Sequence, residues 1–96
     1  MLRVDVLRWS VRVLHEYVGD GYGRPTEAAS RALDLVARTE GVILDPVYTA
    51  KAFAGLVGDI SRGVISTDDG VVFLHTGGAP ALFATTDVYW PVHHKA

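Results

Sequence analysis

The sequence predicts an α/β fold, a partial three-layer parallel sheet with flanking helices. Two amphipathic segments, 26–40 and 46–62, alternate with short apolar runs of strand-like composition. The last run, VVFL at 71–74, is apolar at every position, which is typical of a parallel strand buried on both faces. A glycine-rich turn follows it. Strands and helices in this alternating order favour a layered α/β architecture.

Size and composition limit the possibilities. The 96 residues form one domain at most, and a net charge of −2 disfavours nucleic-acid binding. Without cysteine the chain has neither disulfides nor thiolate metal sites. No apolar run is long enough to span a membrane, and the first residues do not resemble a signal peptide. We therefore expect a cytoplasmic protein that binds neither membranes nor nucleic acid.

The N-terminal half contains one clear helix. The runs RVDVL and VRVL alternate like strands, and they are either two short strands or one longer edge strand. Residues 19–25, GDGYGRP, form a loop by composition. Thr26 is a suitable N-cap for a helix that Gly41 ends. One face of this helix is apolar and is expected in the core: Ala29, Ala32, Leu33 and Val36.

The second half predicts a short buried strand at 42–44, a helix and the strand 71–74. Asp45 and Pro46 have the residue types of an N-cap and a first helical position, so the helix is expected to begin there. Its apolar residues recur at helical spacing and predict its core face: Phe53, Leu56, Val57 and Ile60. Ligands in open α/β sheets bind at the carboxyl ends of strands. Both DPVYT and HTGG follow strands, so both are candidate binding turns.

Together these motifs resemble the D-cysteine desulfhydrase and 1-aminocyclopropane-1-carboxylate deaminase family. The similarity covers EYVGDGYGRPTEAASRALDLVARTEGVILDPVYTAKAFAGL and FLHTGGAPALF, about residues 14–84, with four motifs in the same order. The tail 85–96 does not extend it. The resemblance implies the tryptophan synthase β-like fold (fold type II), pyridoxal 5'-phosphate (PLP) as cofactor, a small amino-acid substrate and a homodimer.

The resemblance also implies roles for individual residues. Tyr22 and Tyr48 correspond to tyrosines that reach the substrate side of the cofactor, where a neutral phenol can donate or accept a proton. Thr49 and Thr76 are expected near the pyridine ring, and Gly77 beside the cofactor. The deaminase branch has glutamate at the position of Thr49, so the threonine favours the desulfhydrase branch. The implied reaction removes the α-proton and eliminates sulfide, giving pyruvate and ammonia.

Each of these residues also has a structural interpretation. Tyr22 could cover the edge of the core, Tyr48 and Thr49 could be first-turn helix residues, and Thr76 could bond its own backbone. His75 is expected to be a buried structural histidine, and adjacent His93 and His94 lack a third metal ligand. Solvated helix faces are expected for three charged residues: Arg38, Lys51 and Asp59.

Two departures from the family limit the functional prediction. The family has glycine where this chain has Ala50, which is expected to cost about 1 kcal/mol or to shift the turn if the site needs positive φ. The lysine that binds PLP and the phosphate loop belong to family regions with no counterpart here, and Lys51 matches a non-catalytic lysine. We therefore expect a C-terminal fragment, inactive without its missing N-terminal portion. The alternatives are a deaminase-like fragment, a stand-alone binding or interaction module, and a nonfunctional truncated product.

Overall fold

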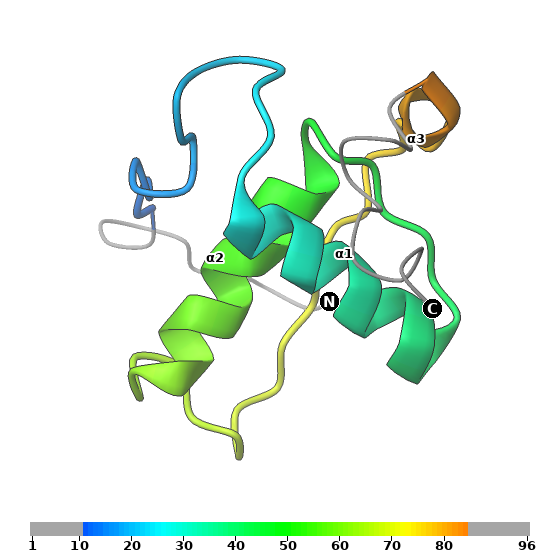
Figure 1. Ribbon diagram of the computed structural model, residues 1–96. Coiled ribbons are helices and arrows are strands. Elements are labelled where there is room, and N and C mark those ends of the chain that lie inside the picture. The colour runs from blue at the N-terminus through cyan, green and yellow to red at the C-terminus, as the bar shows by residue number, and fades with distance from the viewer. Residues whose placement is uncertain (1–10, 85–96) are drawn as a thin grey trace, which may run out of the picture.

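The computed structural model describes residues 11–84 and contains three helices in that range (Figure 1). They are α1 (Glu27–Glu40), α2 (Thr49–Ser61) and the short α3 (Pro80–Ala84). α1 packs against α2, and the segment before α1 loops beside α2 (Figure 1). The expected strand at residues 3–7 and the tail 85–96 lie outside the described residues.

The prediction for α1 is confirmed at both ends. The Thr26 hydroxyl accepts a hydrogen bond from the Ala29 amide at 3.1 Å, and Gly41 ends the helix in the left-handed conformation with φ of +66°. The four predicted core residues are buried: Ala29, Ala32, Leu33 and Val36. Arg38 lies on the solvated face, where it pairs with Asp34 one turn earlier.

α2 begins three residues later than predicted. Residues 46–48 form a turn instead of a first helical turn. The Thr49 amide bonds the Asp45 carboxylate, and the Asp45 carbonyl accepts from Ala50, five residues on, instead of from Thr49 as in an α-helix. Ala50, the second helical residue, is fully buried in the core, so its methyl group packs instead of disturbing the turn. A glycine is therefore not required at this position.

The core joins α1 to α2 and to the chain on either side of α2. It comprises Ala29, Leu33, Val36, Leu44, Ala50 and Leu82. Phe53 and Phe73 pack against it edge to face, with ring centroids 5.0 Å apart. The predicted core face of α2 is correct for Phe53 but wrong for Ile60, which is 36% exposed. α1 covers the face of α2 that carries the alanines. Within residues 11–84 no sheet covers the larger apolar side chains of α2.

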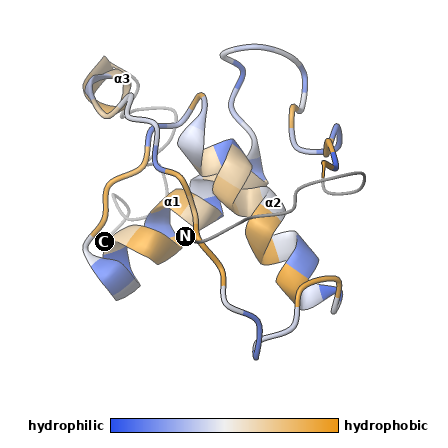
Figure 2. Cartoon of the chain, turned by 180° about the vertical axis from the view of Figure 1, so that it is seen from behind, coloured by the Kyte–Doolittle hydropathy of each residue, from blue (hydrophilic) through white to orange (hydrophobic). Residues whose placement is uncertain are grey.

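The strand predictions are wrong for the described part of the chain, where residues 11–14, 42–44 and 71–74 form no ladder. The last two run as extended, hydrophobic chain without a neighbouring strand (Figure 2). Val72 is 95% exposed instead of buried on both faces. A strand needs a partner for its backbone hydrogen bonds, and within residues 11–84 neither segment has one. The parallel sheet is thus unconfirmed.

Candidate functional site

A hollow of about 670 Å³ lies where three segments of the chain meet. The N-terminal segment supplies Tyr22, the turn before α2 supplies Tyr48 and Thr49, and the residues after 71–74 supply Thr76. The structure therefore brings together four of the five predicted site residues. Gly77 is not among the lining residues.

The two predicted catalytic tyrosines contact each other across 26 residues of sequence. Their hydroxyl groups are hydrogen-bonded, and their rings meet edge to face with centroids 5.8 Å apart. The hydrogen bond to Tyr22 is the main reason that the pKa of Tyr48 lies above its usual value, and burial and the nearby Asp45 charge raise it further. Tyr48 is therefore a protonated phenol at neutral pH, and the pair can present a proton donor to the hollow.

Asp45 holds the turn that positions Tyr48 and Thr49. Its carboxylate accepts hydrogen bonds from the amides of Val47, Tyr48 and Thr49 at 2.7–2.8 Å. Asp45 is fully buried, and burial alone would raise its pKa. The hydrogen bonds from the Thr49 hydroxyl and the backbone outweigh burial and hold the pKa below the usual value. The sequence marked Asp45 as a helix cap, and its larger role is to fix the shape of the whole turn.

The Thr49 hydroxyl is engaged by the same carboxylate. It donates to Asp45 Oδ1 at 2.6 Å and accepts from the Asp45 amide at 2.7 Å. Because a hydroxyl has one proton, Thr49 cannot donate to a ligand without releasing Asp45. The Thr76 hydroxyl is exposed and has no hydrogen-bond partner among residues 11–84, which leaves it available to a ligand.

The HTGG turn packs on Asp45 and on the chain before it. His75 is satisfied, as expected, but it is exposed: Nδ1 accepts from the Gly77 amide, so Nε2 carries the proton donated to the Ile43 carbonyl at 2.8 Å. Gly77 and Gly78 have φ of +101° and +96°. A Cβ on Gly78 would lie 2.8 Å from Asp45 Cγ. Close approach to Asp45 thus explains the second glycine of the motif.

Lys51 is buried, which corrects the expectation of a solvated helix face. Its ammonium group donates to the carbonyl oxygens of Val18 at 2.8 Å and Gly21 at 3.2 Å. The loop that carries Tyr22 lies over the first turn of α2 and excludes water from Lys51, which is only 9% exposed. Lys51 therefore fixes the loop next to the hollow. Its position in the first helical turn gave no indication of this contact.

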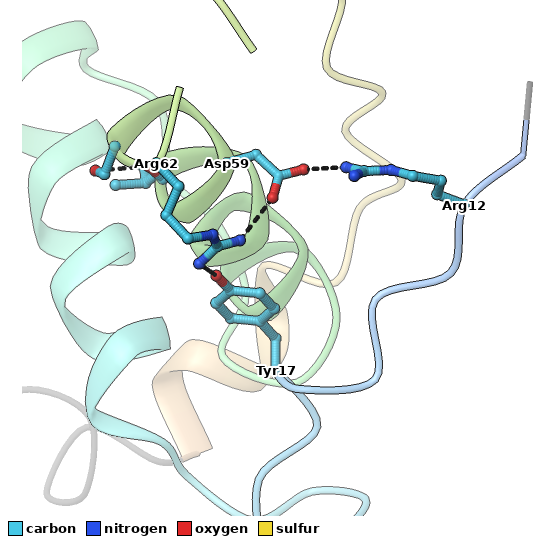
Figure 3. Close-up of polar contacts among 6 residues, drawn as sticks. Arg12, Tyr17, Asp59 and Arg62 are labelled. Carbon is cyan, nitrogen blue, oxygen red and sulfur yellow. Dashed lines mark hydrogen bonds and ion pairs between the residues drawn. The ribbon is translucent and has the colours of Figure 1, made fainter. Parts of the chain in front are cut away.

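Asp59 is also buried, contrary to expectation, and its carboxylate joins two arginines (Figure 3). Arg12 reaches it from the N-terminal segment at 2.5 Å, and Arg62 from the end of α2 at 2.7 Å. Arg62 also donates to the Tyr17 hydroxyl at 3.1 Å, a bond that raises the pKa of Arg62. Tyr17 lies over Gly58, where a Cβ would meet its hydroxyl oxygen. The cluster ties the N-terminal segment to α2.

The described residues contain no grouping of histidine, cysteine, aspartate or glutamate suited to a metal ion. None of the helices in this part of the chain is long and apolar enough to cross a membrane.

Comparison with known proteins places these features in a family. Residues 2–77 match the family described as "Pyridoxal-phosphate dependent enzyme". D-cysteine desulfhydrases of Salmonella typhi and Salmonella newport are 50% identical to the chain over 74 residues, which are 77% of this chain and 23% of each relative. The chain thus spans about a quarter of the length of these relatives. On the extent of the family match, the chain belongs to the pyridoxal-phosphate dependent enzymes.

Proposed function

We propose that the chain is the C-terminal part of a lyase of the D-cysteine desulfhydrase type, which converts D-cysteine to pyruvate, ammonia and sulfide. Family membership implies the tryptophan synthase β-like fold and PLP in the complete enzyme. The observation that carries the proposal is the Tyr22–Tyr48 hydroxyl pair at the hollow. The sequence identity to D-cysteine desulfhydrases supports this choice of reaction.

Tyr22 and Tyr48 suit the departure of a sulfur leaving group. Two phenols hold two protons, and the hydrogen bond between them uses one. The other proton can be donated to the sulfur atom as its bond to the β-carbon breaks. The raised pKa of Tyr48 keeps Tyr48 protonated at neutral pH, so the pair adds no charge that would repel the departing thiolate.

The described residues fit one wall of a PLP site but not its covalent anchor. When bound, PLP withdraws electrons from the α-carbon of an amino acid. Lys51, the single lysine within residues 11–84, holds two carbonyl oxygens and is a charged donor instead of a nucleophile. Thr76 suits a contact with the cofactor ring, whereas Thr49 is committed to Asp45. We propose that the anchor lies in a complementary polypeptide and that the complete enzyme is a homodimer.

The exposed apolar segments support the proposal that a second polypeptide completes the site. Val42, Val72 and Leu74 are 40%, 95% and 78% exposed. Apolar residues clustered on a surface indicate an interaction site. A polypeptide that completes the sheet would cover them and close the hollow against water. The cytoplasmic location stays a prediction.

Complementation tests the proposal. The chain is purified alone and mixed with the N-terminal portion of a D-cysteine desulfhydrase, and the visible absorbance of lysine-bound PLP and pyruvate formation from D-cysteine are measured. We expect both signals only in the mixture. Tyr48→Phe in the chain should lower pyruvate formation by roughly 10²-fold or more while the absorbance remains.

Two controls separate the alternatives. Tyr89→Phe, outside the described residues and outside the family resemblance, should leave the rate unchanged. Release of ammonia from 1-aminocyclopropane-1-carboxylate in the same mixture, with no pyruvate from D-cysteine, would favour the deaminase. A mixture with neither absorbance nor product contradicts the lyase proposal.

A further inference from the structure

Two positively charged residues line the hollow, and within residues 11–84 no aspartate or glutamate does. The two residues are Arg12 and Lys51. Lys51 is bound by carbonyl oxygens and forms no ion pair in this range. A buried ammonium without a counter-ion favours anions nearby, because the Coulomb attraction is screened less there than in water.

The Arg12 guanidinium is held in place but keeps free donors. One of its terminal nitrogens bonds Asp59 at 2.5 Å, and the side chain is 57% exposed. Asp59 shares its single negative charge with Arg62, so the cluster of two arginines and one carboxylate has a net positive charge (Figure 3). Arginine has five N–H donors and can therefore bind Asp59 and a second anion together.

The rest of the lining indicates the kind of anion. The free amides of a helix N-terminus are a common phosphate site. At the start of α2 the amides of Val47, Tyr48 and Thr49 are already bound to Asp45. Apolar side chains from the N-terminal segment, the turn and residue 74 form the walls: Val13, Leu14, Val47 and Leu74. A carboxylate with a short apolar body fits such a hollow better than a phosphate.

We propose that the hollow binds small monocarboxylates, with Arg12 as the residue that binds the carboxylate group. In this arrangement Asp59 and Arg62 position the Arg12 guanidinium, and Lys51 adds positive potential. The choice of probe, pyruvate, rests on the proposed function, whereas the site rests on the charges and contacts of this chain. Binding therefore needs neither PLP nor a complementary polypeptide.

Titration of the full chain with pyruvate, followed by amide NMR shifts, tests the site. Methyl pyruvate serves as the uncharged control and inorganic phosphate as the competing anion. We expect saturable shifts at residues 48, 51 and 76 with pyruvate, and weaker binding of methyl pyruvate and of phosphate. Arg12→Gln should weaken pyruvate binding by about tenfold or more, the effect of one charge-assisted hydrogen bond. Arg12→Lys should restore part of it.

One matched variant separates binding from folding. Arg31→Gln removes an exposed arginine of α1 that does not line the hollow, and it should keep pyruvate affinity within about twofold. Absence of saturable shifts in the wild-type chain, equal binding of the methyl ester, tighter binding of phosphate, or unchanged affinity in Arg12→Gln would each overturn the proposal. Loss of pyruvate binding leaves the complementation result unaffected, so the two proposals fail independently.

Discussion

The α1–α2 pair and the extended segments 42–44 and 71–74 differ in how their backbone is satisfied. The helices bond within themselves, and Thr26 and Gly41 complete the ends of α1. The extended segments are apolar, yet Val72 and Leu74 are largely exposed. The backbone hydrogen bonds of a helix lie within one segment, whereas those of a strand need a neighbouring segment. The difference teaches that the helical part of this chain satisfies its own backbone, whereas the extended segments have no strand partner within residues 11–84.

The largest expected effect tests that division directly. Leu33→Ala removes a side chain that is 1% exposed in the helical core and should lower the free energy of unfolding by roughly 2–5 kcal/mol. Val72→Ala, at a side chain that is 95% exposed, should change it by less than about 0.5 kcal/mol. Urea unfolding followed by circular dichroism measures both.

Addition of the complementary polypeptide tests whether the effects of Val72→Ala and Leu33→Ala differ in the same way after assembly. If residues 71–74 become a buried strand, Val72→Ala should then weaken assembly, measured as a higher concentration of the partner needed for half-maximal complementation. Equal destabilisation by Val72→Ala and Leu33→Ala in the free chain would show that the extended segment is already packed.

Asp45 joins the two regions, because it caps the turn before α2 and lies against the HTGG turn that follows residues 71–74. Asp45→Asn replaces an acceptor oxygen with an NH2 group that faces amide donors. We expect a loss of roughly 1–3 kcal/mol in the free energy of unfolding at neutral pH, measured with urea. Asp34→Asn on α1, at a half-buried carboxylate that pairs with Arg38, is the control and should cost less than about 1 kcal/mol.

The pH dependence of this loss follows from the lowered pKa of Asp45. A carboxyl group whose pKa is lower in the folded state stabilises the fold fully at pH values above its unfolded-state pKa of 3.8. This stabilisation is lost as the pH falls through the folded-state pKa. The difference between wild type and Asp45→Asn should therefore narrow only under strongly acidic conditions. A difference that already closes near pH 6 would contradict the lowered pKa.

The sequence predicted the helical region well, and four of the five residues that it marked for a site lie together, although their roles stay predictions. Thr26, Gly41 and the apolar face of α1 are signals that lie within the helix and its caps, so the sequence shows them directly. Tyr22, Tyr48 and Thr76 were found by family resemblance, and the structure brings them to one hollow. That resemblance could not show the bond between the phenols, which depends on the loop folding over α2.

The remaining errors concern residues whose environment is set by distant parts of the chain. Lys51 and Asp59 have the spacing of solvated helix residues, and the N-terminal segment buries both. Arg12 lies 47 residues from its partner Asp59, so no local pattern links them. Periodicity indicates which residues share a face, but not what covers that face.

The smallest expected effect concerns the two glycines after Thr76. Both have positive φ, so alanine at either position strains the backbone by about 1–3 kcal/mol. A Cβ on Gly77 meets nothing within 4 Å, whereas on Gly78 it would lie 2.8 Å from Asp45 Cγ. The free energy of unfolding of Gly78→Ala should therefore be lower than that of Gly77→Ala, by about 1 kcal/mol if Asp45 moves only partly away from the new methyl group.

The excess cost of Gly78→Ala arises from Asp45 and not from the backbone, so it should shrink when Asp45 is replaced by alanine. A double-mutant cycle by urea unfolding measures this coupling, with Gly77→Ala as the matched background. Equal costs for the two alanine substitutions would mean that the HTGG turn moves freely relative to Asp45. The extended region would then be unattached to the helical region at this point. A measurable coupling would mean that the cap of α2 holds residues 71–78 in place before any partner binds.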